Sequence, residues 1–152
     1  MKGDKQIIKR IKTLLENSKL KSANEKDSSV AKFEEILKSA PNDKHAWMNL
    51  GCLYHRKFQF EKAIENKLKA ASIYPNDPEV KFSLGCSYCA KGDFSAAIKS
   101  YSEALALKPD YVEACEGLAE QYQIIGQLAK AEKWLSKAEE LKCATAKNMS
   151  WS

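Results

Sequence analysis

The sequence of 152 residues is poor in residues that break or cross-link a chain, with only 4 Pro, 6 Gly and 5 Cys. So little proline and glycine excludes a collagen-like chain and a Pro/Gly-rich disordered chain. Five cysteines are an odd number without clustered spacing, which argues against a disulfide framework and favours free thiols in a reducing compartment. No run of about 18 apolar residues occurs, so no transmembrane helix is predicted.

The first ten residues, Met1 to Arg10, contain no continuous apolar segment. A secretory signal is therefore not expected, and the protein is predicted to be cytoplasmic. The net charge of +5 is too small to imply a nucleic acid partner. It is graded along the chain, because residues 1–40 carry 10 Lys or Arg against 6 Asp or Glu, whereas residues 110–152 carry 5 against 7. The sequence thus predicts a basic beginning and an acidic end.

A repeat of 34 residues dominates the sequence, as Pro41, Pro75 and Pro109 show by their spacing. Between these prolines the units align without gaps. Equivalent positions hold Leu50, Gly51, Tyr54, Ala63 and Ala70 in the first unit, Leu84, Gly85, Tyr88, Ala97 and Ala104 in the second, and Leu118, Ala119, Tyr122, Ala131 and Ala138 in the third. Apolar residues recur at three and four positions within each unit, which predicts amphipathic helices.

The spacing predicts two helices in each unit. These six helices are expected at about residues 44–57, 60–73, 78–91, 94–107, 112–125 and 128–141. Gly92 and Gly126 suit the turns within a helix pair, where a left-handed conformation is expected. Asp77, Asp93 and Asp110 are candidate N-caps, since each precedes an expected helix.

Residues 1–42 are predicted to form a divergent helix pair at the N-terminal end of the array. The segment from Ser29 to Leu37, followed by Pro41, matches the second half of a further unit. Its expected partner helix, near residues 5–20, has an apolar stripe but carries Asn17 where Gly is expected. The predicted organisation is one domain, residues 1–152, with repeats at 44–77, 78–111 and 112–143 and a tail at 144–152.

This pattern resembles the tetratricopeptide repeat (TPR) family, whose 34-residue unit carries an aromatic residue, Leu-Gly, Tyr, Ala, a second aromatic residue, Ala and Pro in order. The departures are Lys67, where an aromatic residue is usual, and Lys81 and Cys115, which replace the first aromatic residue. The resemblance implies an all-α, right-handed superhelical solenoid of antiparallel helix pairs. It also implies a protein–protein interaction module that binds a peptide or helix segment of a partner, as a scaffold or adaptor.

In the family that the sequence resembles, the first helix of each repeat lines a concave groove. The family's inward-facing positions correspond here to His45, Met48, Cys52, His55 and Arg56, then Phe82, Cys86 and Cys89, and then Glu113, Glu116 and Glu120. The expected groove is basic at one end, apolar in the middle and acidic at the other end. One subgroup grips the C-terminal carboxylate of heat-shock chaperones with five polar residues, of which only Asn49 is matched here, so that role is disfavoured. Asn49 is nevertheless included as a twelfth candidate groove residue.

Other functions were weighed against this interpretation. A small dedicated TPR chaperone for secreted substrates and a regulatory fragment of a larger protein are the alternatives. An enzyme is not expected, and no catalytic or cofactor-binding residue is proposed, because the sequence has no nucleotide-binding motif and an open groove offers no closed pocket. One group of residues has the ligand composition of a Cys3His zinc site: Cys52, His55, Cys86 and Cys89. Helix axes about 8–10 Å apart are too distant for Zn–S bonds of about 2.3 Å, so no metal site is expected.

The C-terminal end of the array predicts a weak homo-oligomer through the last repeat. Repeat arrays need a terminal cap for solubility, but only residues 142–152 follow the last expected helix, too few for a stable separate helix. Trp134 or Leu135 should then be partly exposed. The acidic end complements the basic end of another copy, which favours a salt-sensitive head-to-tail contact, whereas a tail-to-tail contact would rely on apolar burial.

Overall fold

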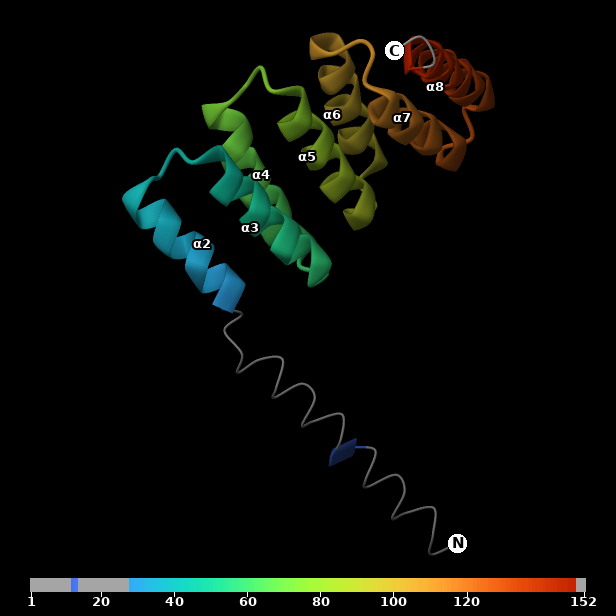
Figure 1. Cartoon of the computed structure of the whole chain (residues 1–152). Helices are drawn as coiled ribbons and strands as arrows, with labels where there is room; N and C mark the ends of the chain where they lie inside the picture. The colour runs from blue at the N-terminus through green and yellow to red at the C-terminus, as the bar shows by residue number, and fades with distance from the viewer. Residues whose placement is uncertain (1–11, 14–27, 150–152) are drawn as a thin grey trace, which may run out of the picture.

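The computed structural model describes residues 12–13 and 28–149 of the chain. Within this part the chain forms seven helices, α2 to α8, and no strand. Their bounds are α2 Ser28–Ser39, α3 Lys44–Arg56, α4 Phe60–Ile73, α5 Pro78–Lys91, α6 Phe94–Leu107, α7 Val112–Ile124 and α8 Leu128–Met149. Figure 1 shows these helices as antiparallel neighbours stacked in sequence order along a curved array. The predicted fold class, an all-α solenoid, is confirmed.

The six helices predicted from the 34-residue spacing are α3 to α8. The largest difference is in α8, which continues to Met149, whereas the sequence predicted an end near residue 141. Residues 142–149 contain no Pro or Gly, and Cys143 stands where the earlier units have a proline. Because they extend an existing helix, they need no new nucleus, which the sequence argument had wrongly required of them. The helix expected near residues 5–20 lies almost entirely outside the described residues.

Aspartates cap three of the helices. Asp77 and Asp93 accept hydrogen bonds from backbone N–H groups in the first turns of α5 and α6, as predicted. Asp43 caps α3 in the same way, although the sequence analysis did not propose it. The prediction for Asp110 is wrong, because Tyr111 is the N-cap of α7 and Asp110 lies one residue too early.

Small residues allow the helices to approach closely. The alanines at the repeat positions are buried: Ala63, Ala70, Ala97, Ala104, Ala131 and Ala138. Two glycines face the ring of Tyr101 on α6, since an added Cβ would lie 2.7 Å from this ring at Gly85 and 2.9 Å at Gly117. Tyr101 therefore occupies space that α5 and α7 leave open only by lacking side chains at these positions. None of the helices α2 to α8 is long and apolar enough to cross a membrane.

The turns inside the helix pairs differ between units. Gly92 and Gly126 adopt the left-handed conformation, with φ of 86° and 77°, as predicted. Phe58 occupies the equivalent position of the first unit and has φ of 58°. A residue with a Cβ is strained in this conformation. The repeat pattern gave no prediction for this position.

Candidate functional site

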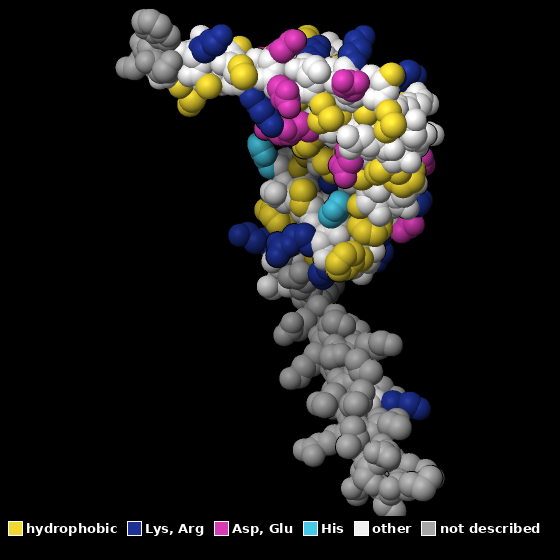
Figure 2. Space-filling view, turned by 90° about the vertical axis from the view of Figure 1, so that its right-hand side faces the viewer, with side chains coloured by type: hydrophobic (Ala, Val, Ile, Leu, Met, Phe, Trp, Pro, Cys, Tyr) yellow, Lys and Arg dark blue, Asp and Glu magenta, His cyan; other side chains and the backbone are white. Residues whose placement is uncertain are grey.

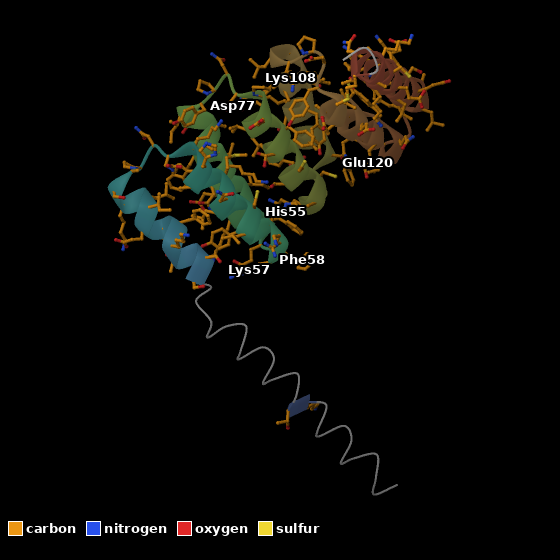
Figure 3. The ribbon with its side chains drawn as sticks, viewed as in Figure 1. His55, Lys57, Phe58, Asp77, Lys108 and Glu120 are labelled. Atoms are coloured by element: carbon orange, nitrogen blue, oxygen red, sulfur yellow. The ribbon has the colours of Figure 1, made fainter. Side chains whose placement is uncertain are left out.

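The candidate groove residues lie on α3, α5 and α7, the first helices of the three pairs. Six of them are exposed: His45, Asn49, Cys52, Arg56, Glu113 and Glu120. The other six are partly buried: Met48, His55, Phe82, Cys86, Cys89 and Glu116. Figure 3 labels His55 close to the C-terminal end of α3 and Glu120 beside α7. Every one of the twelve therefore retains some contact with solvent.

An aromatic cluster forms the middle of the candidate groove. The ring of Phe82 lies 5.6 Å from that of Tyr101 and 5.0 Å from that of Tyr111, measured between centroids. The hydroxyl of Tyr101 donates to Sγ of Cys86 at 3.5 Å. Burial raises the pKa of the Cys86 thiol. Burial and the nearby charge of Glu113 raise the pKa of Tyr111 to about 12. These side chains are therefore neutral at pH 7 and present an apolar, preformed surface.

A buried lysine lies between α3, α4 and α5. Lys67 of α4 is only 3% exposed, and its Nζ donates to the carbonyl oxygen of Ser83 at 3.0 Å and to Oγ of Ser87 at 2.8 Å. Oγ of Ser87 also lies 3.4 Å from Nδ1 of His55. Burial lowers the pKa of Lys67, and burial together with the charge of Lys67 lowers the pKa of His55. His55 is thus biased toward its neutral form.

Sequence reasoning identified Lys67 only as a replaced aromatic residue and missed this polar contact. The available signal was a charged residue at the position where the next unit has Tyr101, since the two are equivalent in the repeat. Burial at that position forces the ammonium to find acceptors, and the nearest ones lie on α5.

A second buried polar group lies one repeat further on. Gln121 of α7, equivalent to Ser87 of α5, is fully buried. Its Nε2 donates to Sγ of Cys89 at 3.1 Å. Its Oε1 has no hydrogen-bond partner among the described residues. Polar contacts therefore join α3 to α5 and α5 to α7 at equivalent places.

The acidic end of the groove is altered by the length of α8. Lys142, in the part of α8 beyond the predicted end, forms an ion pair with Glu116 of α7. This contact raises the pKa of Lys142. One of the three predicted carboxylates is thus already paired, while Glu113 and Glu120 are exposed. Their negative charge is available to a ligand.

The cysteines do not form a metal centre with histidines or acids in the described chain. Among residues 28–149, no three His, Cys, Asp or Glu side chains are grouped so that they could hold a metal ion. Cys86 and Cys89 instead accept hydrogen bonds from Tyr101 and Gln121.

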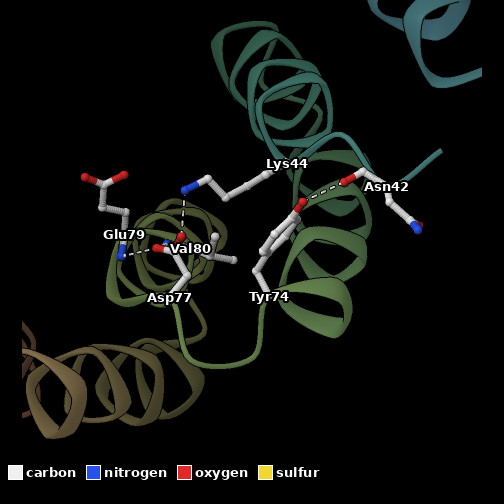
Figure 4. Close-up of polar contacts among 6 residues, drawn as sticks. All are labelled: Asn42, Lys44, Tyr74, Asp77, Glu79 and Val80. Carbon is white, nitrogen blue, oxygen red and sulfur yellow. Dashed lines mark hydrogen bonds and ion pairs between the residues drawn. The ribbon is translucent and has the colours of Figure 1, made fainter. Parts of the chain in front are cut away.

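A hollow of about 590 Å³ lies at the turn between α4 and α5, and Lys108 at the end of α6 also lines it. Figure 4 shows its polar contacts, in which Nζ of Lys44 lies 2.7 Å from Oδ2 of Asp77 and the hydroxyl of Tyr74 donates to the carbonyl oxygen of Asn42 at 2.9 Å. Burial opposes ionisation of Asp77, but Lys44 and two backbone N–H groups outweigh it and lower the pKa of Asp77. These groups satisfy one another, so the contact joins two repeats.

Comparisons with known proteins agree with the helical pattern. A tetratricopeptide repeat model matches residues 44–77, and a TPR repeat model matches residues 85–124. No curated protein matches the chain. Among solved structures, MamA of strain MSR-1 is 26% identical, with 82% of this chain and 71% of that chain covered and a TM-score of 0.69. MamA of strain AMB-1 is 27% identical, with 81% and 73% covered and the same TM-score.

A third solved structure, MamA from Desulfovibrio magneticus RS-1, is 21% identical, with 76% of this chain and 65% of that chain covered and a TM-score of 0.71. At this identity the likeness is one of fold. The two matched segments coincide with the helix pair α3 and α4 and with the stretch from α5 to α7. The spacing, the helix pairs and these matches together show an array of TPR type, in which residues 44–77 and 85–124 match tetratricopeptide repeat models.

Proposed function

We propose that the protein is a non-enzymatic scaffold or adaptor that holds a segment of a partner protein in the groove of α3, α5 and α7. Arrays of TPR units are protein-interaction modules, and their extended concave surface is the usual binding face. The observation that carries the proposal is the order in which basic, aromatic and acidic side chains follow one another across the three helices. A preformed aromatic surface at Phe82 lies between a basic end at Arg56 and an acidic end at Glu113 and Glu120.

This order of charges defines the kind of segment that fits. Its acidic residues would lie toward α3, its apolar residues over Phe82 and its basic residues toward α7. A partner side chain on Phe82 would contact a ring already held by Tyr101 and Tyr111, so little side-chain freedom is lost on binding. The proposal places the module in the cytoplasm, where free thiols stay reduced.

Selection of a displayed random-peptide library against the immobilised protein tests the proposal. We expect enriched peptides with acidic residues at one end, aromatic or aliphatic residues in the centre and basic residues at the other end. Changing Glu113→Lys together with Glu120→Lys should weaken binding of a selected peptide by about tenfold or more, because two exposed attractions become repulsions. Phe82→Ala should have a similar effect, since central aromatic residues dominate binding energy.

The matched control is Glu140→Lys, which reverses an exposed charge on α8 outside the groove. It should leave peptide affinity unchanged. Urea unfolding of each variant shows whether the Phe82→Ala protein is still folded at the temperature of the binding assay. Selected peptides that bind equally well to all of these variants would show that the groove is not the binding surface.

A further inference from the structure

The turn between α3 and α4 contains a strained aromatic residue that the packing of the molecule does not explain. Phe58 has φ of 58°, whereas Gly92 and Gly126 provide the left-handed residue in the other two units. Its side chain is 80% exposed. The contact it makes is an edge-on approach to Phe60, with 6.1 Å between ring centroids. The folded monomer thus tolerates backbone strain for a ring that buries little of its own surface.

The surroundings of Phe58 are basic and hollowed. Arg56 and Lys57 precede it and are both exposed. They line a depression of about 300 Å³ together with Leu53 and Ser29, and no acidic residue is among the described residues that line it. Figure 3 shows Phe58 and Lys57 near the C-terminal end of α3. We call residues 53–60 the Phe58 turn.

A surface with complementary chemistry lies at the other end of the array. Leu128, Glu132, Leu135 and Glu139 follow one another at spacings of four, three and four, which places them on one face of α8. All four are exposed, with Leu128 at 67% and Leu135 at 38%. Exposure of Leu135 agrees with the expectation from sequence. We call these four residues the α8 stripe.

The α8 stripe is left uncovered in the described part of the chain, where no helix follows α8. Ile124 and Ile125, at the end of α7, are also exposed and extend the apolar surface next to Leu128. Figure 2 shows acidic and basic side chains interspersed toward the α8 end of the molecule, and a basic group near the opposite end of the array. The charged residues of the α8 stripe itself are both glutamates, so the stripe is apolar and acidic, opposite in charge to the Phe58 turn.

We propose that the Phe58 turn of one copy binds the α8 stripe of a second copy. The ring of Phe58 would pack on Leu128 and Leu135, while Arg56 and Lys57 would lie near the two stripe carboxylates. Glu132 and Glu139 lie seven residues apart on α8, which at 1.5 Å per residue is about 10 Å along the helix. The side chains of an arginine and a lysine on one turn can span this distance. Only Arg56 is shared with the proposed groove, so this contact goes beyond the groove function.

The contact is heterologous, because each copy offers one Phe58 turn and one α8 stripe. Such contacts form open chains of molecules unless their rotation closes a ring. Two Phe58 turns would bring like charges together, and so would two α8 stripes, which disfavours the symmetric dimers. A contact of this small size is expected to be weak, and salt should weaken it further by screening the charges at its rim.

Sedimentation of the purified full-length protein over a concentration series tests the proposal. The weight-average mass should rise with concentration at low salt and fall when salt is added. Phe58→Gly should weaken association by about tenfold, as loss of an aromatic anchor does at other interfaces. Glu132→Lys combined with Glu139→Lys should have at least the same effect, whereas Glu140→Lys, which lies off the stripe, should have none.

Mixing the two defective variants gives the sharpest result. The Phe58→Gly protein keeps its α8 stripe, and the Glu132→Lys/Glu139→Lys protein keeps its Phe58 turn. Equal amounts should therefore form a one-to-one dimer that grows no further, at concentrations at which each variant alone is monomeric. Association of Phe58→Gly as strong as that of the wild type, a mixture that stays monomeric, or a wild-type protein that is monomeric at every concentration and salt would each overturn the proposal.

Discussion

Replacing Lys67 with methionine is expected to stabilise the protein at neutral pH. Lys67 is 3% exposed, and no carboxylate among residues 28–149 forms an ion pair with it. Burying a charge costs several kcal/mol, whereas hydrogen bonds from a charged donor contribute about 1.5–3 kcal/mol each. The two bonds to Ser83 and Ser87 therefore offset most of the penalty without exceeding it.

Methionine preserves the unbranched stem that packs against Gly51, where an added Cβ would lie 2.8 Å from Cγ of Lys67. The Ser83 carbonyl remains inside α5, and the Ser87 hydroxyl can bond to the backbone of its own helix. We therefore expect Lys67→Met to raise the free energy of unfolding by about 1–2 kcal/mol. Lys67→Ala, which also removes the stem, should lower it by about 2–4 kcal/mol through the cavity it leaves.

The pH dependence separates the charge from the packing. Burial lowers the pKa of Lys67 below the ordinary value of 10.5, so the unfolded chain binds this proton more tightly than the folded protein does. The penalty is complete at pH values below the lowered pKa and disappears as the pH rises toward 10.5. The advantage of Lys67→Met over the wild type should therefore shrink as the pH is raised through this window.

Urea unfolding followed by circular dichroism, at neutral pH and at several values up to pH 10.5, measures both quantities. Comparing the methionine variant with the wild type cancels the titration of the tyrosines, which the two proteins share. A Lys67→Met protein less stable than the wild type by more than about 1 kcal/mol would show that the hydrogen bonds exceed the penalty, and the reasoning would be refuted. A stability difference independent of pH would refute the assignment to charge.

Three further changes test separate features. Phe58→Gly should raise stability by about 1 kcal/mol and the melting temperature by about 2–4 °C, because glycine relieves the left-handed strain; an unchanged melting temperature in calorimetry would contradict this. Gly85→Ala should lower stability by about 1–3 kcal/mol, since its Cβ meets the ring of Tyr101, and chemical unfolding measures the loss. Asp77→Ala should cost about 1 kcal/mol at pH 7 through the lost cap of α5. Because the pKa of Asp77 is lowered, the stability that its carboxylate contributes is complete above pH 3.8 and is lost as the pH falls through the lowered value. The free energies of unfolding of Asp77→Ala and the wild type should therefore become equal in acid.

The positions of the helices could be predicted because each repeat depends on the same local pattern. Alanine and glycine recur at the close contacts, such as Ala97 and Gly85, and any other spacing would bring bulky side chains into the helix interfaces. In the same way, two of the turns within the helix pairs could be predicted from Gly92 and Gly126. The groove residues were assigned to the correct helices for this reason, although their role in binding stays a prediction.

Features that depend on one unit differing from the others were not predicted. Lys67 and Phe58 occupy positions where the repeat pattern expects other residues, and the partners of Lys67 lie on α5, whose packing against α4 the sequence alone does not show. The ion pair between Lys142 and Glu116 required α8 to continue past its predicted end. Lys67 and Lys142 each depend on a partner 16 to 26 positions away, and Lys142 depends also on a helix boundary, about which periodicity carries no information.

Two of the inter-repeat contacts described above differ in kind, and this difference is expected to divide the array into unequal cooperative units. Tyr101, locked between Gly85 and Gly117, couples α5, α6 and α7 through a buried ring, whereas α3 and α4 are coupled to α5 through a desolvated ammonium. In a linear array, stability is the sum of repeat and nearest-neighbour terms, so the weaker coupling sets where the chain opens first. Amide hydrogens of α3 and α4 should therefore exchange with solvent by separate opening of the N-terminal part, while those from α5 to α7 exchange only when the whole array unfolds. Among the helices from α3 to α7, α3 and α4 are thus expected to be the ones most free to change their orientation when a partner segment binds.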